Sequence, residues 1–188
     1  MSSGSIDLST EKGLVLGCTR QDRKAQRALY ERFSSRMFVV CLRYAKDRDE
    51  AQDLLQEGFI TVFAKISTFS GAGSLEGWMR RIFVNTALMR LRKGDVLRGA
   101  ADVDEPAARS VSSQEDILSG IGGKDILRLI RQMPDGFRIV FNMNVLEGYS
   151  HQEISKELGI SEGTSRSQLS RARAWLQERL REKLEERK

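Results

Sequence analysis

Hydrophobic residues recur along the chain at the spacing of an α-helix. A first stripe, with positions three or four residues apart, consists of Leu29, Phe33, Met37, Val40 and Tyr44. Side chains at this spacing lie on one face of a helix. The stripe predicts a helix over residues 25–46 with one buried face, and the charged run 47–49 interrupts it.

Two more stripes follow, at residues 51–69 and 75–93, separated by the glycine-containing segment 70–73. Ser74 is placed to cap the third helix. We expect its apolar row to be buried, and this row comprises Leu75, Trp78, Ile82 and Met89. At about 100° per residue, Asn85 falls at the edge of that row, next to a basic row of Arg81 and Arg92. Three such helices predict an antiparallel bundle over residues 25–93.

The helical pattern stops between residues 94 and 123, where Gly, Ala, Ser and acidic residues predominate. We predict a flexible linker there. As a random coil it would span about 30 Å, so the two halves of the chain could occupy separate sites. Residues 1–24 are interpreted as an N-terminal tail and the start of the first helix.

Periodicity resumes in residues 124–188, which we predict to be a second helical domain. Pro134-Asp135-Gly136 separates two of its helices, and Ser150 with Glu153 forms a capping box that opens another. After the turn 159–161, Ser161 is a good cap for a last helix that ends in a charged tail. The paired helices have the dimensions of a helix-turn-helix. The fold class predicted is all-α, with two small helical domains joined by a flexible linker.

The last helix carries many hydrogen-bond donors. Its expected exposed positions are Arg166, Ser167, Gln168, Ser170, Arg171 and Arg173. Such side chains can reach DNA phosphates or base edges. A plain helical hairpin with a solvated basic face fits the same pattern.

Charge and composition agree with a polyanionic partner. The 188 residues hold 31 Lys and Arg against 26 Asp and Glu, which gives a net charge of +5. No run approaches the ~18–20 apolar residues of a membrane-spanning helix, and the N-terminus lacks the pattern of a secretion signal. We therefore expect a cytoplasmic protein without membrane insertion.

Candidate catalytic and metal-binding groups are scarce. Cys18 and Cys41 are too few for a disulfide scaffold or a four-cysteine zinc site, so we expect both to be reduced, with Cys41 in a core. His151 is the single histidine; no catalytic triad or second metal ligand accompanies it in the sequence, so we expect a surface position at the start of a capped helix. No nucleophile with a base and no glycine-rich phosphate loop is evident, so we expect neither an enzyme nor a bound metal or cofactor.

Two segments carry a resemblance to a known family. GYSHQEISKELGISEGTSRSQLSRARAWL resembles region 4 of the sigma-70 family of bacterial transcription initiation factors. DLLQEGFITVFAKISTF followed by LEGWMRRIFVNTALMRLRK resembles region 2 of its compact extracytoplasmic-function (ECF) group. With LYERF and MPDGFRIVF, the resemblance covers nearly all of residues 25–175.

The resemblance assigns two functions to region 2. The first is binding to core RNA polymerase, which it implies for Asp53, Gln56, Glu57 and Phe59. The second is reading of the melted −10 element through a base pocket, which it implies for Phe69, Ser70, Gly71, Ile82 and Asn85. Contacts with phosphates near the fork are implied for Arg80, Arg81, Arg90, Arg92 and Lys93. Taken without the resemblance, Gln56 and Glu57 read as solvated residues, Phe69 as a core residue and Asn85 as a partner of nearby backbone.

For region 4 the resemblance implies that the last helix enters the −35 major groove. The residues concerned are Gly163, Thr164, Arg166, Ser167, Ser170, Arg171 and Arg173. Ser165 departs from the apolar residue that many members carry, which puts the packing of this helix or its −35 preference in doubt.

The sequence therefore indicates a sigma factor whose partners are core RNA polymerase and promoter DNA, with an anti-sigma factor as a further partner in many relatives. The alternative hypothesis is an autonomous helix-turn-helix regulator with a helical dimerisation or ligand domain. The region 2 segments favour the sigma factor, because a generic dimeric regulator has no reason to contain them.

Overall fold

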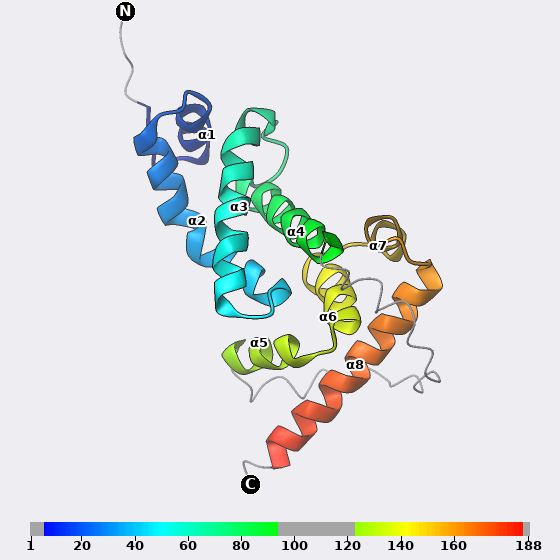
Figure 1. The fold of residues 1–188 in the computed structure, drawn as a ribbon. Helices are drawn as coiled ribbons and strands as arrows, with labels where there is room; N and C mark the ends of the chain where they lie inside the picture. The colour runs from blue at the N-terminus through cyan, green and yellow to red at the C-terminus, as the bar shows by residue number, and fades with distance from the viewer. Residues whose placement is uncertain (1–5, 94–122, 186–188) are drawn as a thin grey trace, which may run out of the picture. The chain divides into compact units, whose positions relative to one another are not determined.

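A computed structural model describes residues 6–93 and 123–185 (Figure 1). Within these ranges the chain forms helices and turns and no β-strand, so the predicted all-α class is confirmed. Contacts divide the chain into two units, Met1–Met89 and Arg90–Lys188. Residues 94–122 of the predicted linker lie outside the described ranges. Among the described helices, none is long and apolar enough to cross a membrane.

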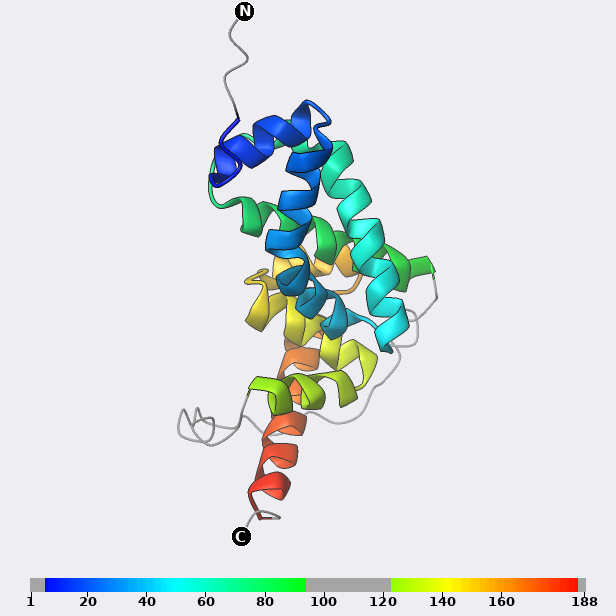
Figure 2. The same ribbon diagram turned by 90° about the vertical axis from the view of Figure 1, so that its left-hand side faces the viewer.

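The first unit is built from α1 to α4, with a short 3₁₀ turn, η1, after α3 (Figures 1 and 2). The bounds are Glu11–Thr19 for α1, Arg23–Tyr44 for α2, Arg48–Lys65 for α3, Ile66–Thr68 for η1 and Leu75–Lys93 for α4. Side chains of Thr10, Asp22 and Asp47 accept backbone N–H groups at the starts of α1, α2 and α3. These caps explain where the helices begin, because the first turn of a helix has N–H groups with no partner inside it.

The core of this unit follows the first predicted stripe. All five of its residues, from Leu29 to Tyr44, are at most 1% exposed. They face α3, which lies beside α2. The prediction for α4 is wrong in part. Leu75 is buried, but Met89 is 57% exposed and Trp78 and Ile82 are half-buried.

A second apolar row on α4 enters the core instead. It consists of Met79, Phe83, Val84, Ala87, Leu88 and Leu91. The sequence offers apolar residues on both sides of this helix, and periodicity alone does not decide which side faces the bundle. Packing decides it, because the ring of Phe83 lies against α3.

Gly58 makes this packing possible. A Cβ atom added at Gly58 would lie 2.1 Å from Cε1 of Phe83, far inside van der Waals contact. The next residue, Phe59, meets the Phe83 ring edge to face, with ring centroids 5.3 Å apart. The absence of a side chain at position 58 thus lets the Phe83 ring fill the space beside α3.

The second unit contains the predicted helix-turn-helix. Its elements are α5 (Gly123–Gln132), α6 (Asp135–Phe141), the π-helical turn η3 (Asn142–Leu146), α7 (His151–Leu158) and α8 (Glu162–Glu185). Both α6 and α7 pack on α8. Core residues here include Ile139, Val140, Ile154, Leu169 and Ala172.

Both predicted caps of the helix-turn-helix are present. The Ser150 side chain accepts the N–H of Glu153, whose carboxylate accepts the N–H of Ser150 at 2.8 Å. Ser161 Oγ accepts the N–H of Thr164 at 2.9 Å. Between the helices Gly159 adopts φ +69°, a left-handed conformation that glycine tolerates best. The turn that orients α8 is therefore fixed by local chemistry.

Candidate nucleic-acid and partner interfaces

The outward face of α3 carries three of the residues expected to bind polymerase. Asp53, Gln56 and Glu57 are exposed, and because Gln56 and Glu57 follow Asp53 by three and four positions, all three lie on one side of the helix. Ile60, one turn further on, is 69% exposed. Sequence reasoning missed Ile60, although its position three residues after Glu57 could have placed it on this face. An apolar side chain among polar ones is typical of a protein interface.

Phe59 does not belong to that exposed face. Its side chain is 4% exposed and packs against three other rings, with centroid distances of 4.7 Å to Tyr30, 6.0 Å to Phe63 and 5.3 Å to Phe83. The expectation of a direct contact between Phe59 and a partner therefore does not fit the structure. An aromatic residue next to the polar face points inward here because it fills the space between α2, α3 and α4.

A surface groove of about 320 Å³ lies between α2 and α3, beside this face. Its lining residues are Tyr30, Ser34, Ser35, Phe38, Arg48, Gln52, Leu55 and Gln56. The Arg48 guanidinium lies 5.2 Å from the centre of the Phe38 ring, a cation–π arrangement. Gln56 thus belongs both to the groove and to the outward face of α3.

The exposed face of α4 has a basic edge and an apolar edge. Asn85 is exposed, and by helical geometry it lies in the middle of this face instead of at the border of the core. Arg81 and Arg92, both exposed, lie on one side of Asn85, while Ile82 and Met89 lie on the other. Asn85 lies between these two edges as predicted, but the apolar edge is half-buried at Ile82 and exposed at Met89.

Phe69, from the loop before α4, adds an aromatic ring to the same surface. It is half-buried, and its ring centroid lies 5.6 Å from that of Trp78. Phe69 is therefore partly exposed, although it packs against Trp78 as the alternative reading of a core residue implies. Ser70 and Gly71, which follow it, are exposed.

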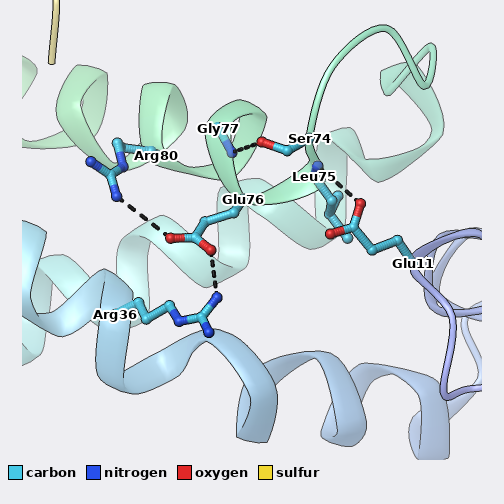
Figure 3. A network of polar contacts seen from close by, with 7 residues as sticks. All are labelled: Glu11, Arg36, Ser74, Leu75, Glu76, Gly77 and Arg80. Carbon is cyan, nitrogen blue, oxygen red and sulfur yellow. Dashed lines mark hydrogen bonds and ion pairs between the residues drawn. The ribbon is translucent and has the colours of Figure 1, made fainter.

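Polar contacts hold the first turn of α4 in place (Figure 3). Ser74 Oγ accepts the N–H of Gly77 at 3.1 Å, as predicted for a capping residue, and Glu11 of α1 accepts the N–H of Leu75 at 3.3 Å. Glu76 accepts from Arg36 of α2 at 2.5 Å and from Arg80 at 3.5 Å. The first turn of α4 is therefore tied to both α1 and α2.

This network also distinguishes the arginines of α4. Arg80 is half-buried beside the Glu76 carboxylate, whereas Arg81 points to solvent. Arg90 is half-buried, and the side chain of Lys93 lies outside the described part of the structure. Of the expected phosphate contacts, Arg81 and Arg92 are exposed, but Arg92 is ion-paired with Glu157 at 3.0 Å.

The outward face of α8 presents most of the residues expected to bind the −35 element. Gly163, Arg166, Ser167, Ser170 and Arg173 are exposed, while Thr164 and Arg171 are half-buried. Arg166 is held by the Glu162 carboxylate at 2.7 Å.

The expectation that Gln168 is exposed is wrong. Its side chain is 4% exposed and lies beside a small cavity lined in part by Ile139, Val140 and Leu158. Its position on α8, one residue before buried Leu169, turns it toward α6 and α7.

The residue that departed from the family pattern, Ser165, is fully buried. Its Oγ lies 2.8 Å from Nδ1 of His151, at the start of α7. His151 is half-buried and bonded to α8, so the expected surface position is only partly correct. A buried hydroxyl requires a hydrogen-bond partner, and His151 supplies it. Fourteen residues separate the two positions, so the pair could not be recognised before α7 and α8 were placed.

Neither cysteine offers a reactive or metal-binding site. Both thiols are free and buried, which confirms the core position of Cys41. Burial raises the pKa of Cys41 to about 12, and burial together with the charge of Asp22 raises that of Cys18 to about 11. In the part of the chain that the structure describes, no cluster of three His, Cys, Asp or Glu side chains could hold a metal ion.

Comparison with known protein families identifies both halves of the chain. The family model for sigma-70 region 2 matches residues 29–96, and the model for sigma-70 region 4 matches residues 123–176. The chain belongs to the sigma-70 family. The region 2 match includes α3 and α4, and the region 4 match includes α7 and α8 as far as residue 176.

Curated relatives place the protein in the ECF group of sigma factors. It is 30% identical over 155 residues to the ECF sigma factor SigE of Mycolicibacterium smegmatis, a match that covers 81% of this chain and 60% of that relative. It is 27% identical to the ECF sigma-E factor of Haemophilus influenzae, with 91% of this chain and 95% of the relative covered. The sigma-E factor of Escherichia coli K12 is 28% identical, with 87% and 91% covered.

A solved structure supports the fold. The sigma factor RpoE of Bartonella quintana, crystallised with the anti-sigma factor NepR, matches with a TM-score of 0.51 and 22% identity. The match covers 82% of this chain and 96% of that one. The protein is thus a sigma factor, a non-enzymatic factor that directs the initiation of transcription at promoters.

Proposed function

We propose that this sigma factor binds core RNA polymerase through α3 and reads promoter DNA through α4 and α8. The observation that carries the proposal is the exposed face of α4, where an amide, Asn85, lies between arginines and apolar side chains. Arginines suit phosphates, and an amide suits the hydrogen-bonding edge of a base that is no longer paired. This combination has no role in packing the bundle.

In the proposed −10 contact, an unpaired base enters a pocket formed by the loop before α4 and by α4 itself. The residues assigned to it are Phe69, Ser70, Gly71, Ile82 and Asn85. The Phe69 ring and Ile82 would contact the face of the base, and Asn85 would bond its edge. Arg81 would contact a phosphate of the same strand, whereas Arg92 and Arg80 would do so only by leaving or sharing the Glu157 and Glu76 carboxylates.

In the proposed −35 contact, α8 lies in the major groove of duplex DNA. Arg166, Ser167, Ser170, Arg171 and Arg173 are assigned to bases and phosphates. Gly163 and Thr164, in the first turn, would bring backbone N–H groups close to a phosphate. To contact DNA, Arg166 must break its ion pair with the Glu162 carboxylate. The free-energy cost of breaking this pair favours a strong, bidentate acceptor on a base of the DNA.

The proposed polymerase contact uses Asp53, Gln56 and Glu57, with Phe59 supporting them from beneath. Ile60 extends the face as an apolar anchor. Because these partners reside in the bacterial cytoplasm, we place the protein there. We also include an anti-sigma factor among its partners, since RpoE of Bartonella quintana has such a complex. The proposed domains are residues 25–93 and 124–188.

The polymerase contact is tested by a double variant, Gln56→Ala with Glu57→Ala. Binding to core polymerase should weaken while helicity and melting temperature stay near those of the parent, because both positions are exposed. The matched control is Gln132→Ala with Glu178→Ala, an exposed pair of the same residue types in the second unit. Equal affinity of the double variant, the control and the parent for core would exclude this surface.

The promoter function is tested by transcription in vitro with bacterial core polymerase. The parent protein should support initiation at a cognate promoter above core alone, and Asn85→Ala should reduce it. A sharp dimer footprint on duplex DNA without any stimulation of core would instead favour the autonomous regulator.

A further inference from the structure

We propose that Met89 is a second base-contacting residue of α4, which packs against the base adjacent to the one that Asn85 reads. This inference rests on the proposed −10 function and extends it. It assigns two different tasks to one helix face: Asn85 recognises a base by hydrogen bonding, and Met89 adds affinity that does not depend on which base is present.

The exposure of Met89 is the first observation. Its side chain is 57% exposed, whereas the other methionine of α4 that the core uses, Met79, is 0% exposed. Met89 does not stand alone on this surface, because half-buried Ile82 lies on the same edge of the helix two turns earlier. Trp78 and Phe69 continue the apolar surface, with ring centroids 5.6 Å apart. Several exposed or half-buried apolar side chains on one edge of an otherwise polar face indicate a binding surface.

The distance between Asn85 and Met89 along α4 determines which base Met89 can contact. Met89 lies four residues after Asn85, which is about 6 Å along the helix axis. Adjacent bases of a stacked strand are ~3.4 Å apart, and an unstacked strand is longer. A strand that places one base at Asn85 therefore places a neighbouring base within reach of the flexible Met89 side chain.

The positions of the charged side chains on α4 favour single-stranded DNA as the ligand of this face. By helical geometry Arg81 and Arg92 lie about 40° and 20° to one side of Asn85, and Met89 lies about 40° to the other side. A strand whose phosphates follow the arginine edge turns its bases toward the methionine edge. A thioether packs well against an aromatic ring of any orientation, so each of the four bases offers Met89 a comparable contact.

The test uses holoenzyme and promoter DNA whose −10 region is held unpaired, with a single abasic site placed at successive positions of the non-template strand. Met89→Gln keeps the length and helical preference of the side chain but removes its apolar end. The variant should bind the intact template about two- to tenfold more weakly, the range of a sulfur–aromatic contact. One abasic position, next to the base that Asn85 reads, should weaken the parent by a similar factor and leave the variant unaffected.

The matched control is Leu16→Gln, which removes another exposed apolar side chain, on α1 of the same unit, and should bind as the parent does. Equal binding by Met89→Gln and the parent, or an equal loss at every abasic position, would overturn the inference. Asn85→Ala, measured in parallel, separates this failure from a wider one. If Asn85→Ala loses base discrimination while Met89→Gln is silent, only the role of Met89 fails. If both are silent, the proposed −10 function of α4 fails as well.

Discussion

The Cys41 thiol, on α2, is buried in the core of the first unit, where a thiolate would lose its hydration. Burial accordingly raises its pKa to about 12, against about 8.5 for an exposed thiol. We expect Cys41 of the folded protein to resist alkylation at pH 8 and to react rapidly once denaturant unfolds the first unit. Mass spectrometry after timed iodoacetamide treatment measures this, and rapid labelling of the native protein would contradict it.

The same shift predicts a dependence of stability on pH. The pKa of the Cys41 thiol is higher in the folded state than in the unfolded state. The contribution of the neutral thiol to the free energy of unfolding is therefore fully present below about pH 8.5 and is lost as the pH rises toward about 12. The free energy of unfolding of Cys41→Ala should therefore decline less steeply with pH above 9 than that of the parent. Urea unfolding at several pH values provides the comparison, and parallel curves would refute the expectation.

The burial of individual residues was predictable from the sequence at some positions and not at others. Leu29 and Phe33 are predicted correctly because a single apolar stripe on α2 leaves one possible buried face. Met89 is not, because α4 has apolar residues on both sides. Only the packing of Phe83 against α3 decides which side of α4 is inside. Phe59 lies in the predicted apolar stripe and is buried as that stripe implies, but the direct polymerase contact that the resemblance implied for it does not fit.

A hydrogen bond between His151 and Ser165 links α7 to α8. His151→Ala should destabilise the second unit by about 1–3 kcal/mol, because it leaves the buried Ser165 hydroxyl without its partner. Ser165→Ala should cost less, about 0.5–1.5 kcal/mol, because half-buried His151 can turn to water. The double variant should be more stable than the sum of the two losses implies.

Chemical unfolding of the three variants measures this coupling. Strict additivity would show that the pair does not join α7 to α8. Promoter profiling of the same variants tests whether the pair also sets the −35 preference, the question raised by a serine at this position.

Elements were predictable where local chemistry determines them. The capping box at Ser150 and the cap at Ser161 were both confirmed, because these hydrogen bonds join residues three apart. Two elements escaped prediction. α1 is short and is held by contacts with residues distant in the sequence, such as the hydrogen bond that the Leu75 N–H donates to the Glu11 carboxylate. The π turn after α6 has no signature in the pattern of apolar positions.

For the molecule as a whole, we expect weak binding of free protein to duplex promoter DNA and tight, specific binding once core polymerase is present. A single recognition helix buries little surface, and the −10 face requires a strand that the free protein does not melt. Competition binding of promoter against scrambled duplex, with and without core, measures the difference.

The salt concentration must be fixed in this experiment, because the phosphate contribution falls steeply with added salt. Nanomolar, sequence-specific binding by the free chain at physiological salt would contradict the expectation and support the autonomous regulator. A gain that appears only with core would show that the polymerase completes the DNA-binding surface.

The contact between Gly58 and Phe83 has a genetic consequence. Gly58→Ala adds one methyl group where no space exists, and overpacking of this kind costs about 1–3 kcal/mol. Such an allele should be temperature-sensitive for promoter activity although position 58 touches neither polymerase nor DNA. Phe83→Leu, which removes the obstructing ring, should act as an intragenic suppressor of Gly58→Ala while being harmful by itself. A selection for revertants that regain promoter activity at high temperature would then recover substitutions of Phe83. A screen designed to find residues that contact the promoter would in this way identify a residue of the bundle core.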